Sequence, residues 1–382
     1  MRLLNGTAVI GAPRPAAPGR RRERALRLAS AAIGVAAGLL AGELALRAWS
    51  LATGRNPAQE LQRTVQVLPP KPHPTGCAVG RQASLGQLVR PSREAGIVYE
   101  LKPNIETCFY HSLVHTNSQG LRAPSDFARP KPKDVFRILL LGDSQTFGWG
   151  VDHEQTYGAV LERTLNARPK KKRRVEVVNT GVPGYNAAQE AEVLRLRGLS
   201  FEPDCVFVLF IGNDFGVPFL MLAPPDPLDP RRSYLLATVR AALRPARYER
   251  SRWIFADEEL ADRLTDASLE RVPPEYRHMV GVDGYERALA SMAETGRRAG
   301  VPIVDFADYK GIVPPATEAR LGRAHERLGI LRPTFRYPPR PWLWLSQHDH
   351  HLTAQGHRSL ARRMLAGLHE IGRCLADGKG EP

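Results

Sequence analysis

The sequence predicts an α/β domain in which a parallel sheet lies between two layers of helices, with an N-terminal transmembrane helix and cap insertions added to it. Short, mostly apolar runs such as "VFRILLLG" and "DCVFVLFIG" are typical of strands buried on both faces. Segments with helical spacing, such as "NAAQEAEVLRLRGL", alternate with these runs. This alternation favours a three-layer domain, and 382 residues that are 43% hydrophobic suffice for a sizeable core.

The first element in chain order is a hydrophobic segment behind a basic cluster. Residues 1–27 end in "GRRRERALR" and predict a basic cytoplasmic tail, and residues 28–52 predict a transmembrane anchor. Glu43 and Arg47 are four residues apart near its end, where they can pair. We expect a single-pass protein whose body lies outside the cytoplasm, on the periplasmic side of a bacterial inner membrane. A cleaved signal peptide is the competing interpretation, although no convincing A-x-A site is present.

The rest of the chain divides into a lead-in and the α/β domain. Residues 53–133 are Pro-rich and predict a stalk followed by a small β-rich lead-in. Residues 134–376 hold the alternating strands and helices, with insertions at about 215–283 and 311–347 that we expect to form a cap over the site. Within the first insertion we expect Ala237 to Asp266 to be helical.

Charge and cysteine content limit the partners. The net charge of +15 favours an anionic surface, which could be nucleic acid, a membrane or an envelope polymer. We expect no nucleic-acid partner, because an exported domain would not meet one. The four cysteines include no C-x-x-C pair, so a zinc site is not expected. Cys205 is interpreted as a buried free thiol, and Cys77 and Cys108 could pair in an oxidising compartment.

Polar residues follow three successive strands. The first strand ends in "GDSQTFG", the second in "NTGVPGYN" and the third in "IGNDFG". Because parallel strands end at one edge of the sheet, Ser144, flexible glycines and Asn213 should meet there. A serine nucleophile needs a base, and "QHDHHLTAQGH" supplies His351, with Asp349 to fix its tautomer. Alone, Ser144 could simply cap the following helix.

The histidine cluster suggests another chemistry that we do not expect. His348, His350, His351 and His357 lie close in sequence, but their spacing is not that of a tetrahedral metal site. The sequence therefore implies no metal and no cofactor.

The four blocks together resemble the SGNH (GDSL-type) hydrolase family, in a membrane-anchored subgroup. The resemblance implies a flavodoxin-like fold, Ser144 as nucleophile, His351 as base, and an oxyanion hole made of Gly184, Asn213 and the Ser144 N–H. The family pattern D-x-x-H would place the acid at position 348, whereas this chain has D-x-H with Asp349. A backbone carbonyl could hold His351 instead.

The implied function is a serine esterase that hydrolyses acyl esters, with O-acetyl esters on envelope carbohydrate favoured by the expected location. An O-acyltransferase using the same site and a non-catalytic scaffold on a degenerate fold are the alternatives. The lead-in segment "HTNSQGLRAP" also resembles membrane-anchored members of this family. The partner is thus an acylated small molecule or glycan, and the oligomeric state is not predicted.

Overall fold

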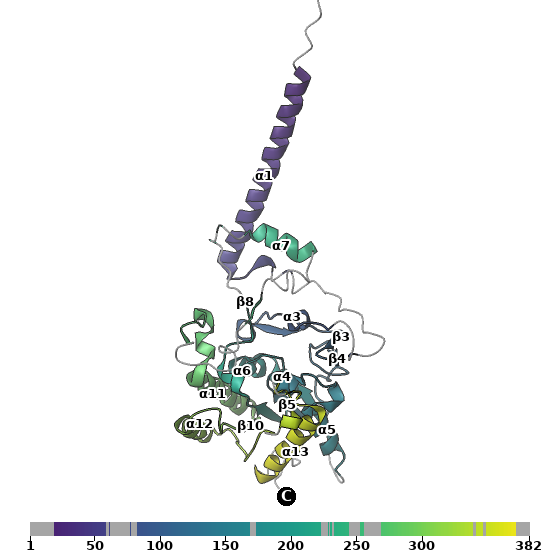
Figure 1. Cartoon of the computed structure of the whole chain (residues 1–382), viewed down its shortest axis with the longest axis vertical. Coiled ribbons are helices and arrows are strands. Elements are labelled where there is room, and N and C mark those ends of the chain that lie inside the picture. The colour runs from purple at the N-terminus through teal and green to yellow at the C-terminus, as the bar shows by residue number, and fades with distance from the viewer. Residues whose placement is uncertain are drawn as a thin grey trace, which may run out of the picture. The chain divides into compact units, whose positions relative to one another are not determined.

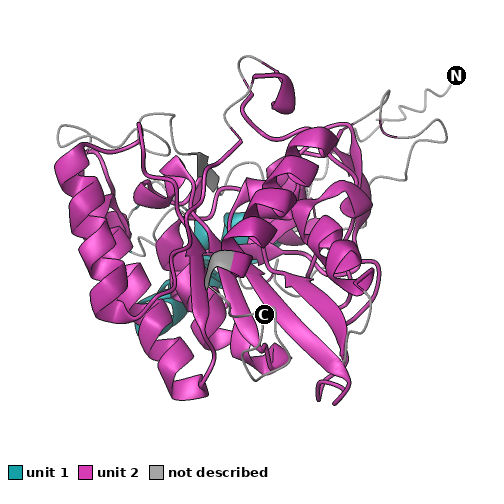
Figure 2. Cartoon of the chain, turned by 90° about the horizontal axis from the view of Figure 1, so that it is seen from below, with its two compact units in different colours: residues 1–58, 225–239 teal, residues 59–224, 240–382 magenta. Residues whose placement is uncertain are grey.

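A computed structural model describes residues 19–58, 61, 77, 82–168, 173–222, 228, 230, 233–243, 253–255, 269–338, 341–346 and 349–371. The chain forms two compact units, one of residues 1–58 and 225–239 and one of the remainder (Figure 2). Residues 1–18, most of 59–81, His348 and the C-terminal residues 372–382 lie outside the described part. The predicted cytoplasmic tail and stalk fall largely in these ranges.

The first unit is built on the long helix α1, Gly19–Thr53 (Figure 1). Residues Arg22–Thr53 are long and apolar enough to cross a membrane, and a signal sequence would meet the same criterion. The expected Glu43–Arg47 pair is present, with 2.8 Å between Arg47 Nε and Glu43 Oε1. Glu43 also accepts hydrogen bonds from the N–H groups of Tyr234 and Leu235, which start helix α7, Tyr234–Leu243. Its carboxylate thereby satisfies donors that the start of a helix leaves free.

The second unit contains the predicted parallel sheet. Its strands are β5 (Val135–Leu141), β6 (Arg174–Asn179), β7 (Cys205–Leu209) and β10 (Ile303–Phe306). They lie in the order β10-β7-β5-β6, and every neighbouring pair is parallel. The runs that the sequence marks as buried strands are therefore the strands of the sheet.

The central strand β5 buries side chains on both faces. Ile138 and Leu140 join the core under α5 (Tyr157–Asn166) and α13 (Ala354–Ile371). Leu139 and Leu141 join the core under α6 (Ala187–Leu196) and α11 (Gly281–Ala299). Because side chains alternate along a strand, this arrangement needs a helix layer on each face. The three-layer fold is thus confirmed, and Figure 2 shows helices on either side of the strands.

The lead-in is β-rich and precedes the sheet. The short helix α3 (Leu85–Leu88) is followed by β1 (Val89–Pro91), which pairs antiparallel with β2 (Tyr99–Leu101). A hairpin follows, made of β3 (Glu106–Phe109) and β4 (Ser112–His115). The other helices in the described part of the chain are α4 (Ser144–Phe147), α12 (Pro315–Leu328) and the 3-10 turns η1 (Ala95–Ile97), η2 (His153–Gln155), η3 (Gly198–Phe201), η4 (Gly212–Phe215), η5 (Pro274–Met279) and η6 (Pro341–Leu343).

Two expectations need correction. Trp253–Phe255 is not helical but forms strand β9, which pairs antiparallel with β8 (Leu220–Leu222). Only residues 234–243 near the expected helix are helical in the described part, while residues 244–252 and 256–266 lie outside it. Cys205 is not a free thiol but is disulfide-bonded. Its apolar neighbours show burial, and burial is equally compatible with a thiol and a disulfide.

Candidate active site

Ser144 lies just beyond the carboxyl end of β5. Gly142 makes a close turn there, and a Cβ at this position would lie 1.9 Å from Thr146 Oγ1. Asp143 then caps α4 by accepting a hydrogen bond from Gln145 N at 2.9 Å. Ser144 is the first residue of this one-turn helix, so capping is done by Asp143, and the serine hydroxyl lies within hydrogen-bond reach of Asp143 Oδ2 at 3.2 Å.

The structure brings Ser144, His351 and Asp349 together. The distance from His351 Nε2 to Ser144 Oγ is 2.7 Å, and from His351 Nδ1 to Asp349 Oδ1 it is 2.6 Å. Asp349 Oδ1 also accepts a hydrogen bond from the His351 backbone N–H at 3.0 Å. The D-x-H spacing therefore lets the acid reach the imidazole, because one carboxylate oxygen of Asp349 meets both the backbone N–H and the ring of His351.

The charge on Asp349 is stabilised by its neighbours. Partial burial raises the pKa of Asp349, but the hydrogen bonds from His351, together with the neighbouring Tyr110 hydroxyl, outweigh burial and hold the pKa well below its usual range. Asp349 is thus a carboxylate at neutral pH. A carboxylate at Nδ1 selects the tautomer whose Nε2 lone pair faces the serine hydroxyl.

The expected oxyanion donors follow the neighbouring strands. In the described part of the chain, neither the Ser144 N–H nor the Gly184 N–H has a hydrogen-bond partner. Gly184 adopts φ +78°, and a Cβ there would lie 2.3 Å from Phe219 Cβ. Asn213 Nδ2 donates to Asp143 Oδ2 at 3.0 Å and to the Tyr185 carbonyl at 3.3 Å, which places the amide beside both the serine turn and the Gly184 loop.

Three residues near the site were missed by the sequence reasoning. The Trp149 ring stacks on His351, with 4.8 Å between ring centroids and 12° between planes. Gln145 Nε2 donates to the His350 carbonyl, and Gln145 Oε1 accepts from Leu352 N, so this side chain ties the histidine loop to the serine helix. The Tyr110 hydroxyl lies beside Asp349 and raises the stability of its charged form. Gln145 and Trp149 stand in the "GDSQTFGWG" stretch itself, which was the available signal.

His357, which belongs to the histidine cluster in the sequence, is part of the core. His357 is fully buried, stacks on Tyr157 and accepts a hydrogen bond from Tyr157 N at its Nδ1. Burial, followed by the charges of Arg122 and His351, lowers the pKa of His357 to about 3. This histidine is therefore neutral and helps to position α13.

A cavity of about 570 Å³ lies between the lead-in and the α6 side of the sheet. Its lining includes four arginines, Arg90, Arg93, Arg129 and Arg197. Ser144 is not in its lining, so this cavity is distinct from the surface where an acyl group would meet the serine.

Comparison with solved structures finds distant matches. A lipase/acylhydrolase from Enterococcus faecalis is 15% identical, with a TM-score of 0.36, over 62% of this chain and 96% of that one. An acetylxylan esterase from Geobacillus stearothermophilus is 15% identical, with a TM-score of 0.37, over 64% and 97%. The psychrotrophic esterase EstA from Pseudoalteromonas sp. is 12% identical, with a TM-score of 0.36, over 62% and 97%. None of the curated protein sequences matches the chain.

A family model covers more than half of the chain. The model of the GDSL-like Lipase/Acylhydrolase family matches residues 140–359, a range that includes Ser144, Gly184, Asn213, Asp349 and His351. Ester cleavage is the activity for which this family is named. The chain therefore belongs to the GDSL-like lipase/acylhydrolase family and is an ester-hydrolysing enzyme.

Proposed function

We propose that the protein is a membrane-anchored serine esterase whose catalytic domain faces the cell envelope. The observation that carries this proposal is the unbroken contact from Ser144 Oγ through the His351 ring to Asp349, with distances of 2.7 and 2.6 Å. Nucleophile, base and orienting acid must be within hydrogen-bond reach of one another for this chemistry, and they are.

The geometry supports an acyl-enzyme route. His351 Nε2 takes the proton as Ser144 Oγ attacks the ester carbonyl carbon. The N–H groups of Ser144 and Gly184, with the Asn213 amide, stabilise the tetrahedral oxyanion. Collapse breaks the bond to the alcohol, which leaves with the proton from His351. Water, deprotonated by His351, then attacks the acyl-enzyme, releases the carboxylic acid and restores Ser144. The side chains supply every proton transfer, so the route requires no cofactor.

The site could also serve acyl transfer. If a sugar hydroxyl replaces water in the second half-reaction, the product is a new ester. The expected envelope location favours O-acetylated glycans as donors or acceptors. Chromatography of the products formed with and without a glycan acceptor separates hydrolysis from transfer, since only transfer leaves the acyl group on the acceptor.

The location rests on two features with different physical origins. The arginines at the start of α1 favour a cytoplasmic N-terminus. The Cys77–Cys108 disulfide and the disulfide-bonded Cys205 favour an oxidising compartment for the body. Reporter fusions after residue 58 and at the C-terminus would test the orientation, and a reporter active only in the cytoplasm would contradict it.

The activity is tested with the full chain in detergent. We expect p-nitrophenyl acetate hydrolysis to disappear in Ser144→Ala and His351→Ala. His350→Ala is the matched control, because its ring lies tilted against Trp344, with 4.4 Å between ring centroids, and takes no part in the proposed proton transfers. Labelling by a fluorophosphonate should occur in the wild type and not in Ser144→Ala. Hydrolysis that persists in a folded Ser144→Ala protein would refute the proposed nucleophile.

A further inference from the structure

The β3–β4 hairpin lies outside the family match, which starts at residue 140, yet its tip lies beside the candidate active site. The Phe109 ring packs edge-on against Trp149 at 4.7 Å, and the Tyr110 ring lies 4.9 Å from the same indole. Trp149 in turn stacks on His351. The hairpin tip and the base thus share one aromatic neighbour.

Tyr110 also reaches the third member of the site. Its hydroxyl faces Asp349, and this interaction, with partial burial second, raises the pKa of Tyr110. The same interaction contributes to the low pKa of Asp349. Asp349 lies on an open loop, so a second donor beside His351 restricts the orientations available to its carboxylate.

The backbone of the tip is held in an uncommon conformation. Tyr110 and His111 form a two-residue turn in which both have positive φ, 47° and 65°. Hairpins need this geometry, but glycine or asparagine normally supplies it. His111 N donates to Gln82 Oε1 at 2.9 Å, and Gln82 Nε2 donates to the Cys77 carbonyl at 2.9 Å. The surrounding chain therefore holds a turn that its own residues do not favour.

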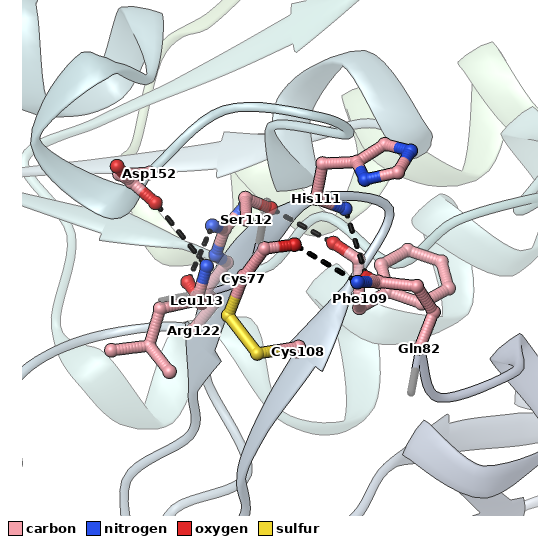
Figure 3. The surroundings of a disulfide bond; sticks show 9 residues. All are labelled: Cys77, Gln82, Cys108, Phe109, His111, Ser112, Leu113, Arg122 and Asp152. Carbon is pink, nitrogen blue, oxygen red and sulfur yellow. Dashed lines mark hydrogen bonds between the residues drawn. A yellow bond between two sulfur atoms is a disulfide. The ribbon is translucent and has the colours of Figure 1, made fainter. Parts of the chain in front are cut away.

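Two further connections fix the hairpin, as Figure 3 shows. The Cys77–Cys108 disulfide ties β3 to the segment before the lead-in. The Arg122 side chain is 1% exposed and donates to the Leu113 carbonyl in β4. The same guanidinium donates to the carbonyls of Gly148 and Val151, at 2.6 Å each, in the loop that carries Trp149. Arg122 therefore joins the hairpin to the serine loop.

We propose that the β3–β4 hairpin completes the active site and that Tyr110 is a positioning residue, which holds Asp349 through its hydroxyl and His351 through Trp149. This inference rests on the proposed function, because it assigns Tyr110 to the same serine, histidine and aspartate. It extends the functional site beyond the family match into the lead-in. The hydroxyl acts through Asp349, so its effect should vanish when that carboxylate is absent.

The test is a double-mutant cycle on the full chain in detergent, with p-nitrophenyl acetate as substrate. Tyr110→Phe keeps the ring against Trp149 and removes only the hydroxyl. We expect kcat to fall about tenfold with KM unchanged, as for loss of a hydrogen bond to a charged group. Tyr110→Ala should lose more, because the ring contact is lost as well. In the Asp349→Ala background, Tyr110→Phe should cost nothing further.

The control is a tyrosine whose hydroxyl is buried without a partner in the described part of the chain. Tyr337 meets this condition, and Tyr337→Phe should keep the wild-type kcat. A wild-type kcat in Tyr110→Phe would overturn the inference, and so would an equal tenfold loss in the Asp349→Ala background. Either result would leave the esterase proposal standing if Ser144→Ala remains inactive. A wild-type protein that neither hydrolyses the ester nor reacts with a fluorophosphonate would overturn both.

Discussion

The Cys77–Cys108 disulfide gives the sharpest quantitative prediction. It joins residues separated by 31 positions. The chain-entropy relation for a closed loop of this length gives a stabilisation of about 3.7 kcal/mol at 25 °C, which the double variant Cys77→Ala/Cys108→Ala would lose. Domains are stable by roughly 5–15 kcal/mol, so the expected loss is a large share of the total.

The contacts of the β3–β4 hairpin indicate which part of the protein should lose stability when the disulfide is removed. The disulfide anchors β3, whose tip residue Tyr110 lies against Trp149, whereas the parallel sheet has its own core on both faces. The hairpin should therefore open before the sheet unfolds. In the double variant, we expect the urea concentration at which activity is lost to be lower than the concentration at which the far-UV circular dichroism signal of the sheet and helices is lost. In the wild type the two transitions should lie closer together.

The assay measures hydrolysis and circular dichroism on the same urea series, without reductant. Reduction of the wild type would not be a clean substitute, because Cys205 is also disulfide-bonded. Ser118→Ala serves as a control for a substitution at a polar lead-in residue that leaves the disulfide intact. The reasoning would be refuted if the double variant lost activity and circular dichroism together, at the same urea concentrations as the wild type.

Three further predictions concern the site and its support. Asn213→Ala should lower kcat on the order of 100-fold or more, with Ser144-dependent hydrolysis as the readout, and an unchanged rate would exclude an oxyanion role. Gly184→Ala should lower both melting temperature and kcat, because a Cβ would lie 2.3 Å from Phe219 Cβ, whereas Gly300→Ala shares the positive φ but meets nothing within 4 Å. His357 has a depressed pKa of about 3, so the unfolded chain binds a proton that the native state does not as pH falls below about 6.5. Unfolding free energy should drop by about 2 kcal/mol from this group between pH 8 and pH 5, and equal pH slopes in wild type and His357→Gln would contradict the assignment.

The elements that could be predicted from the sequence are those whose structure is determined mainly by residues close together in the chain. Apart from Arg137, strand β5 is a run of apolar residues because both of its faces are covered, and that composition is visible in the sequence alone. The serine, glycine, asparagine and histidine blocks could be placed because each follows a strand or precedes a helix, where sites gather in parallel sheets. The tie between Glu43 and Arg47 could be predicted because a helix brings positions i and i+4 together.

The remaining features depend on contacts between distant segments. Trp253–Phe255 becomes a strand only because β8 lies beside it, and no local pattern specifies that pairing. Gln145 meets the histidine loop across about 200 residues of sequence, and Tyr110 approaches Asp349 from a segment without a strong period. When a residue acts only through a partner that is distant in the sequence, no motif or residue spacing reveals its role.

The hairpin links chemistry to compartment. If Tyr110 positions Asp349, the site needs the β3–β4 hairpin in place, and the hairpin is fixed by a disulfide. Disulfides persist in oxidising compartments and not in a reducing cytoplasm. The orientation inferred from the arginines at the start of α1 is thus also the one in which the proposed site is fully assembled. An inverted chain would place the same serine and histidine in the cytoplasm with the hairpin untied, so we expect membrane orientation to contribute to activity through Cys77 and Cys108.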